Sequence, residues 1–222
     1  MAALLLPGVV FYEAAAASVL GERGGRSVLT SRDLINTLFE IFGVIGVHLP
    51  GILLAATLLA QQLISRPGWR LRPIVPLLML CESVVWALPI AVLAGVMGFL
   101  SDIAQPGPTF AASAIAVGAG VYEEFVFRFA LIAAVHALLV DVCSVKEAVG
   151  RWLSVGVSAF AFASFHGIEA GGGIDVEATL FYLIAGVFLA WLFLTRGLGI
   201  AAGAHAVYDL IILVVLPAVS PG

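Results

Sequence analysis

The hydrophobic positions of this chain fall into long runs that are separated by short polar stretches. A bilayer core needs about 20 predominantly apolar residues in one helix, and six runs reach or approach that length. The stretches between them, such as "SRPGWRLRP" and "GIEAGGGID", have the Gly and Pro content of loops. The six runs are roughly Ile35–Ile64, Ile74–Leu100, Thr109–Val140, Trp152–His166, Ala178–Leu194 and Leu198–Val214. They predict an all-α fold, a polytopic transmembrane bundle of about six to eight helices.

The amino-terminal segment is also apolar, but its role is ambiguous. Residues 1–20 have no positive charge before their apolar core, which argues against a cleavable signal peptide. They also contain Pro7 and Glu13, so we interpret them as an interfacial or marginal spanning helix, and whether they cross the membrane stays open. The sequence shows no convincing internal repeat and no linker, so residues 1–222 are interpreted as a single transmembrane domain.

Composition supports a membrane protein and argues against other classes. Hydrophobic residues make up 62% of the chain and charged residues 11%, whereas a soluble domain is roughly half apolar and a quarter charged. The net charge is -4 and no basic stripe is present, so we expect the lipid bilayer as a partner and no nucleic acid. The two cysteines, Cys81 and Cys143, do not make a disulfide framework.

The basic residues between the runs predict an orientation. The stretches after the first, third and fifth runs contain Arg66, Arg70, Arg72, Lys146, Arg151 and Arg196. The intervening loops, 101–108 and 167–177, contain no Lys or Arg. By the positive-inside rule the first set is cytoplasmic. Three further arginines, at 23, 26 and 32, lie on the other side in that scheme.

Ten ionisable residues fall inside the runs, where a charge is costly and usually faces the bundle interior or a cavity. They are Glu40, His48, Glu82, Glu123, Glu124, Arg128, His136, His166, His205 and Asp209. In "VYEEFVFR", Glu124 and Arg128 stand four apart with the acid first, which favours a helical ion pair. Glu123 points about 100° away from that pair, so any partner must come from another helix. We interpret the pair as structural and Glu123 as the candidate general base. For Glu40, His48, Glu82 and His136 we expect structural roles.

Two later runs contain further candidate groups. "FAFASFHG" places Phe162 and His166 four apart, although a lone histidine at a helix end is more often a capping or core residue. "GAHAVYDL" places His205 and Asp209 on one helix face, among small residues that let a neighbouring helix approach. This pair fits a structural hydrogen bond, two metal ligands, or two polar groups aimed at one substrate oxygen.

Taken in order, "EEFVFR", "FASFH" and "HAVYD" resemble the EExxxR, FxxxH and HxxxN/D motifs of the CPBP family. This family groups the eukaryotic CAAX prenyl endopeptidases with many bacterial intramembrane proteases, including abortive-infection and bacteriocin self-immunity proteins. The resemblance covers residues 118–210, about the last half of the chain. It implies an all-helical intramembrane endopeptidase that acts on a peptide or membrane-protein substrate. We expect an integral, multi-pass protein of the bacterial inner membrane.

The resemblance also implies a role for each motif residue. Glu123 activates water with help from His166, while His205 and Asp209 stabilise the oxyanion. The supporting residues of the family's pattern match Glu124, Arg128 and Phe162, the last lining the cavity. We expect no cofactor in this mechanism.

Asp209 departs from the prenyl endopeptidases, which have asparagine at that position. An asparagine amide donates to an oxyanion, whereas an ionised aspartate only accepts. Asp209 therefore either carries a proton or orients His205 and leaves the oxyanion to that histidine. A third possibility is a zinc site formed by Glu123, His166, His205 and Asp209.

Two other classes of function stay open from the sequence. In a transporter or proton-coupled channel, the buried carboxylates and histidines would relay protons. In a non-catalytic scaffold or immunity protein, the motifs would serve packing alone, and Glu123 would be replaceable while Glu124 and Arg128 are kept. The sequence does not name a substrate.

Overall fold

The computed structural model describes residues 2–16, 35, 48–64, 73–98, 109–169 and 175–219, and this part of the chain contains helices and no strand. Five of its helices are long and apolar enough to cross a membrane. They are Ile74–Val96, Phe110–Val142, Glu147–His166, Val176–Arg196 and Leu198–Val219. These helices confirm the predicted all-α fold and correspond to the last five hydrophobic runs.

The two shorter helices lie at the amino-terminal end of the chain. Helix α1 spans Ala2–Ala15 and α3 spans Leu49–Ile64, and both are shorter than the roughly 20 residues that a span needs. Most of the first predicted run before α3, Glu40 included, lies outside the described residues, as do the arginines at 66, 70 and 72 and those at 23, 26 and 32. The predicted orientation stays a prediction.

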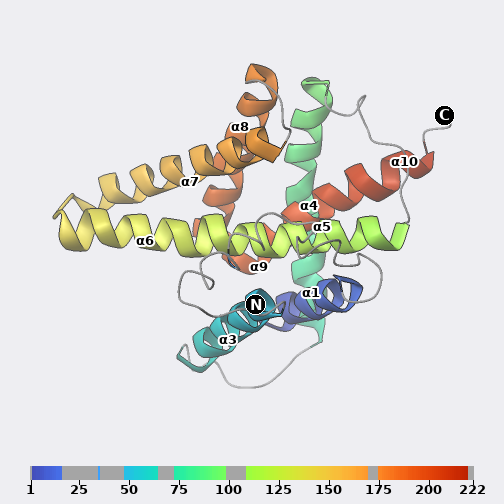
Figure 1. Ribbon diagram of the computed structural model, residues 1–222, viewed down its shortest axis with the longest axis horizontal. Helices are drawn as coiled ribbons and strands as arrows, with labels where there is room; N and C mark the ends of the chain where they lie inside the picture. Colours follow the sequence, from blue (N-terminus) through green and yellow to red (C-terminus); the bar gives the residue numbers. More distant parts are fainter. Residues whose placement is uncertain are drawn as a thin grey trace.

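One long helix runs across the molecule (Figure 1), and its hydrogen-bonding pattern changes three times between α and π. It begins as α5 (Thr109–Glu123), continues as the π-helix η2 (Glu124–Leu131) and α6 (Ile132–Ala137), and ends as η3 (Leu138–Val142). Short π-helical stretches often mark functional sites. Ser158 of the neighbouring helix donates a hydrogen bond of 2.7 Å to the Phe127 carbonyl inside η2, and so ties this stretch to its neighbour.

Helix α4 spans Ile74–Val96, α7 spans Glu147–Glu169 and α8 spans Val176–Arg196; the last segment consists of α9 (Leu198–Leu210), η4 (Ile211–Val215) and α10 (Leu216–Val219). Helices α1, α7 and α9 pack against the long helix, while α4 packs against α9 and α8 packs against α7. Helix α7 begins at Glu147, five residues before the predicted start at Trp152. Its partner α8 is capped by the Asp175 carboxylate, which accepts hydrogen bonds from two backbone N–H groups. Gly197, at φ 86°, supplies the left-handed turn between α8 and α9.

The close approach of α5 and α9 depends on Gly120. A Cβ atom added at this position would lie 2.6 Å from the Ala206 nitrogen and 2.7 Å from the Ala202 oxygen. The two helices therefore meet backbone to backbone, as small residues allow in membrane bundles. This contact lies one turn from Glu123 and flanks His205, so it sets the separation of the two helices that carry those residues.

We expect Gly120→Ala to destabilise the protein by about 1–3 kcal/mol or more, because the added methyl group must push α5 and α9 apart. The measurement is thermal or denaturant unfolding in detergent. Gly156→Ala is the matched control, because a Cβ at this exposed helical glycine meets nothing within 4 Å. Equal stability of the two variants would contradict the proposed role of Gly120.

Two ionisable residues with expected structural roles have partners on other helices. Glu82 of α4 accepts hydrogen bonds from Arg196 of α8 and from Trp86. His48 lies 2.8 Å from the Glu13 carboxylate, which also accepts a hydrogen bond from Tyr122. The Glu13 contacts connect α1 and the residue before α3 to α5, next to Glu123.

Candidate active site

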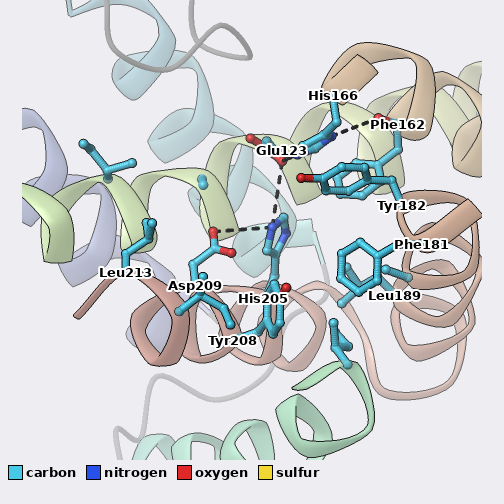
Figure 2. A pocket seen from close by; sticks show the side chains of 15 residues that line it. Glu123, Phe162, His166, Phe181, Tyr182, Leu189, His205, Tyr208, Asp209 and Leu213 are labelled. Carbon is cyan, nitrogen blue, oxygen red and sulfur yellow. Dashed lines mark hydrogen bonds and ion pairs between the residues drawn. The ribbon is translucent and has the colours of Figure 1, made fainter. Parts of the chain in front are cut away.

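Three helices bring the predicted site residues together. Glu123 is the last residue of α5, and its Oε2 atom lies 3.6 Å from Nε2 of His166 on α7 and 3.8 Å from Nε2 of His205 on α9. Asp209 follows His205 by one turn, with 3.6 Å between its Oδ2 and the same Nε2 atom. All four side chains face one cavity (Figure 2). The structure thus places residues from three separate motifs around one carboxylate.

The second glutamate, Glu124, contacts both Arg128 and His205. The predicted ion pair is present: Arg128 Nη1 lies 3.1 Å from Glu124 Oε1, and both side chains are fully buried. The same Oε1 atom lies 2.9 Å from Nδ1 of His205. The two glutamates therefore approach opposite ring nitrogens of one histidine, which the sequence did not predict.

Hydrogen bonds set which ring nitrogens face the cavity. Nδ1 of His166 lies 3.0 Å from the Phe162 carbonyl, and a carbonyl only accepts, so Nδ1 donates and Nε2 is directed toward Glu123. For His205, Nδ1 likewise donates to the Glu124 carboxylate, and Nε2 faces Glu123 and Asp209. Both histidines are thus oriented through Nδ1 and present Nε2.

Phe162 connects the motifs of α5 and α7. Its ring lies 4.1 Å from the Arg128 guanidinium carbon, within the range of a cation–π interaction. The same ring packs 4.4 Å from the His166 ring, between centroids, and its backbone carbonyl accepts the His166 hydrogen bond. Phe162 lines the cavity as expected, and it also positions two other motif residues.

The cavity has a volume of about 350 Å³ and a mostly apolar wall. Besides the four polar site residues and Phe162, it is lined by Ile90, Ile115, Ala119, Phe181, Tyr182, Ala185, Leu189, Tyr208, Ile212 and Leu213. Apolar walls with a few convergent polar groups are typical of binding sites for small molecules and peptides.

Comparison with known families gives a match over the part of the chain that contains this site. Residues 105–211 match the family model described as type II CAAX prenyl endopeptidase Rce1-like. This part of the chain is similar to that family. No curated protein and no solved structure matched the chain.

The matched region contains the cavity's three motif helices, and the matched family is one of CAAX-type intramembrane proteases. Together with the five helices that are long and apolar enough to cross a membrane, the match supports an integral membrane protein with a protease-like region.

Sequence reasoning missed two features of the matched region. Tyr182, in "TLFYLIAG" of α8, stacks on His166 with 4.2 Å between ring centroids and lines the cavity. The only available signal was a polar-tipped aromatic residue within an apolar run. The π-helix η2 was also missed, because hydrophobic periodicity over eight residues does not distinguish it from an α-helix.

Proposed function

We propose that this protein hydrolyses a peptide bond within the membrane and that Glu123 is the general base. The observation that carries the proposal is the position of two histidine Nε2 atoms, 3.6 and 3.8 Å from one Glu123 oxygen, at the wall of a shared cavity. These distances are longer than a direct hydrogen bond, and separations of this size suit groups that share one water molecule.

His166 is proposed to orient the attacking water. Its Nδ1 is committed to the Phe162 carbonyl, so in the neutral ring Nε2 carries the lone pair. A water molecule between His166 and Glu123 donates one hydrogen to Nε2 and the other to the carboxylate. Its oxygen lone pair is then directed at the carbonyl carbon of a peptide in the cavity.

The proposed reaction then proceeds in two steps. The water oxygen bonds to the carbonyl carbon, the carbonyl electron pair moves to its oxygen, and a water proton moves to Glu123. The C–N bond then breaks as the carbonyl reforms, and Glu123 returns the proton to the leaving nitrogen. The products are a carboxyl group and an amine.

His205 is proposed to stabilise the oxyanion formed in the first step. Because Nδ1 donates to Glu124, Nε2 donates to an oxyanion only when the ring carries both protons. Three carboxylates, those of Glu123, Glu124 and Asp209, lie within 4 Å of this ring and offset its charge. Asp209 is proposed to orient Nε2 rather than to donate.

The sequence left a zinc site as an alternative to the metal-free reaction, because two histidines and two carboxylates suit that metal. Among the described residues, however, no group of three or more His, Cys, Asp or Glu side chains is arranged to hold a metal ion. We propose a metal-free reaction, and none of its steps runs through a metal.

We therefore expect o-phenanthroline and EDTA to leave cleavage within about twofold of the untreated rate. The measurement uses purified protein in liposomes and fluorogenic peptides, with and without a prenylated carboxyl-terminal CAAX sequence. A bona fide zinc protease serves as the control for chelation. Loss of cleavage that added zinc restores would establish the metal-dependent alternative.

The same liposomes test the proposal as a whole. We expect the wild-type protein to cleave at least one peptide class, and the comparison of prenylated and plain peptides assigns the substrate. Proton flux without cleavage would instead favour the transporter function. The proposed location is the bacterial inner membrane, which fractionation of cells that express the protein would check.

A further inference from the structure

Tyr182 lines the same cavity as the site residues. It belongs to α8, which contributes no motif residue, and its ring stacks on His166 at 4.2 Å with an interplanar angle of 23°. The ring also lies 6.2 Å from Phe162 and 5.2 Å from Phe181, so three aromatic neighbours fix its orientation. In Figure 2 its hydroxyl group points into the cavity, toward Glu123.

The proposed mechanism lacks one hydrogen-bond donor. An oxyanion hole usually provides more than one preorganised donor, and His205 is the one donor assigned so far. An asparagine at position 209 would offer its amide, but Asp209 in its ionised form only accepts. A phenol O–H is a donor of suitable strength, and Tyr182 presents one to the same cavity.

We propose that Tyr182 is a catalytic residue that donates its O–H to the oxyanion, in place of the amide that Asp209 lacks. This inference rests on the proposed peptide hydrolysis. As the water attacks, the carbonyl electron pair moves to oxygen and accepts hydrogen bonds from Tyr182 and His205. The tyrosine keeps its proton throughout, so the proton count of the reaction does not change.

Tyr182→Phe tests the role directly, because it removes the hydroxyl and keeps the ring that packs on His166. We expect kcat to fall by about 10²-fold, as for the loss of one oxyanion donor, while KM changes by less than about twofold. Tyr12→Phe is the matched control. Tyr12 is a buried residue of α1 that does not line the cavity, so this variant should leave kcat and KM unchanged.

Asp209→Asn provides a second test, which distinguishes a hydrogen-bond donor at Tyr182 from a residue that only packs. If Tyr182 replaces a missing amide, the double variant Tyr182→Phe, Asp209→Asn should recover at least about tenfold in kcat over Tyr182→Phe alone. Such rescue would identify the hydroxyl as a donor to the same oxygen.

Several results would overturn the inference. A kcat of Tyr182→Phe near the wild-type value would do so, as would a loss that Asp209→Asn does not rescue, or a loss seen with Tyr208→Phe instead. Glu123→Gln, measured in parallel, distinguishes a failure of the proposed role of Tyr182 from a failure of the proposed peptide hydrolysis. If Glu123→Gln is inactive and Tyr182→Phe is fully active, only the role of Tyr182 fails; if Glu123→Gln cleaves normally, the proposed function fails with it.

Discussion

Glu123→Gln is expected to abolish peptide cleavage while the protein remains folded in detergent. The amide keeps the size of the side chain but cannot take a proton from water, so the reaction loses its general base. Such a group contributes roughly 10²–10⁴-fold to a rate, and we expect a loss at the upper end because His166 and His205 both converge on this carboxylate. His166→Ala is expected to lose cleavage as well.

Glu147→Gln is the matched control for this experiment. Glu147 is a largely exposed glutamate on α7 that pairs with Arg151, far along the helix from the cavity. Its replacement should change neither cleavage nor unfolding temperature. Full activity of Glu123→Gln would exclude the proposed mechanism and favour the non-catalytic scaffold, in which the motifs serve packing alone.

The second large effect is expected on stability. Arg128→Met removes the positive partner of Glu124 and leaves a carboxylate inside a bundle where both side chains are fully buried. Breaking a buried pair by removing one partner costs about 3–5 kcal/mol. The change also removes the cation from the Phe162 ring. Denaturant unfolding in detergent should show this loss, together with reduced cleavage.

Arg151→Met gives the comparison at the same helical spacing. Arg151 and Glu147 form an ion pair four residues apart, but about half or more of each side chain is exposed. Pairs of this kind contribute about 0.3–0.5 kcal/mol, so the variant should unfold nearly as the wild type does. Similar losses of unfolding free energy in Arg128→Met and Arg151→Met would show that burial does not determine how much the Glu124–Arg128 pair stabilises the protein.

The sequence predicted the helices of this site and their local ion pair better than the contacts between the helices. Long apolar runs predicted the five helices that are long and apolar enough to cross a membrane, because a bilayer imposes a length that few other environments require. The four-residue spacing of Glu124 and Arg128 predicted their ion pair correctly. These features are local, and local patterns are what a single chain displays.

The contacts between helices could not be read in the same way. An α-helical offset assigned Glu123 and Glu124 to different partners, yet both reach His205, one at each ring nitrogen. The partner of Glu82 lies 114 positions away, at Arg196. Tyr182 belongs to no motif, and only the packing of α8 against α7 brings it to His166.

The docking of α9 against α5 has a consequence for biosynthesis. A ribosome releases α5 and α7 before α9, and domains generally fold from the amino terminus during synthesis. Until Ala202 and Ala206 settle on Gly120, His205 does not stand beside the two glutamates. A nascent chain with its earlier helices already in the bilayer therefore holds an incomplete site. The proposed peptide cleavage would therefore require the insertion of α9, which completes the fold.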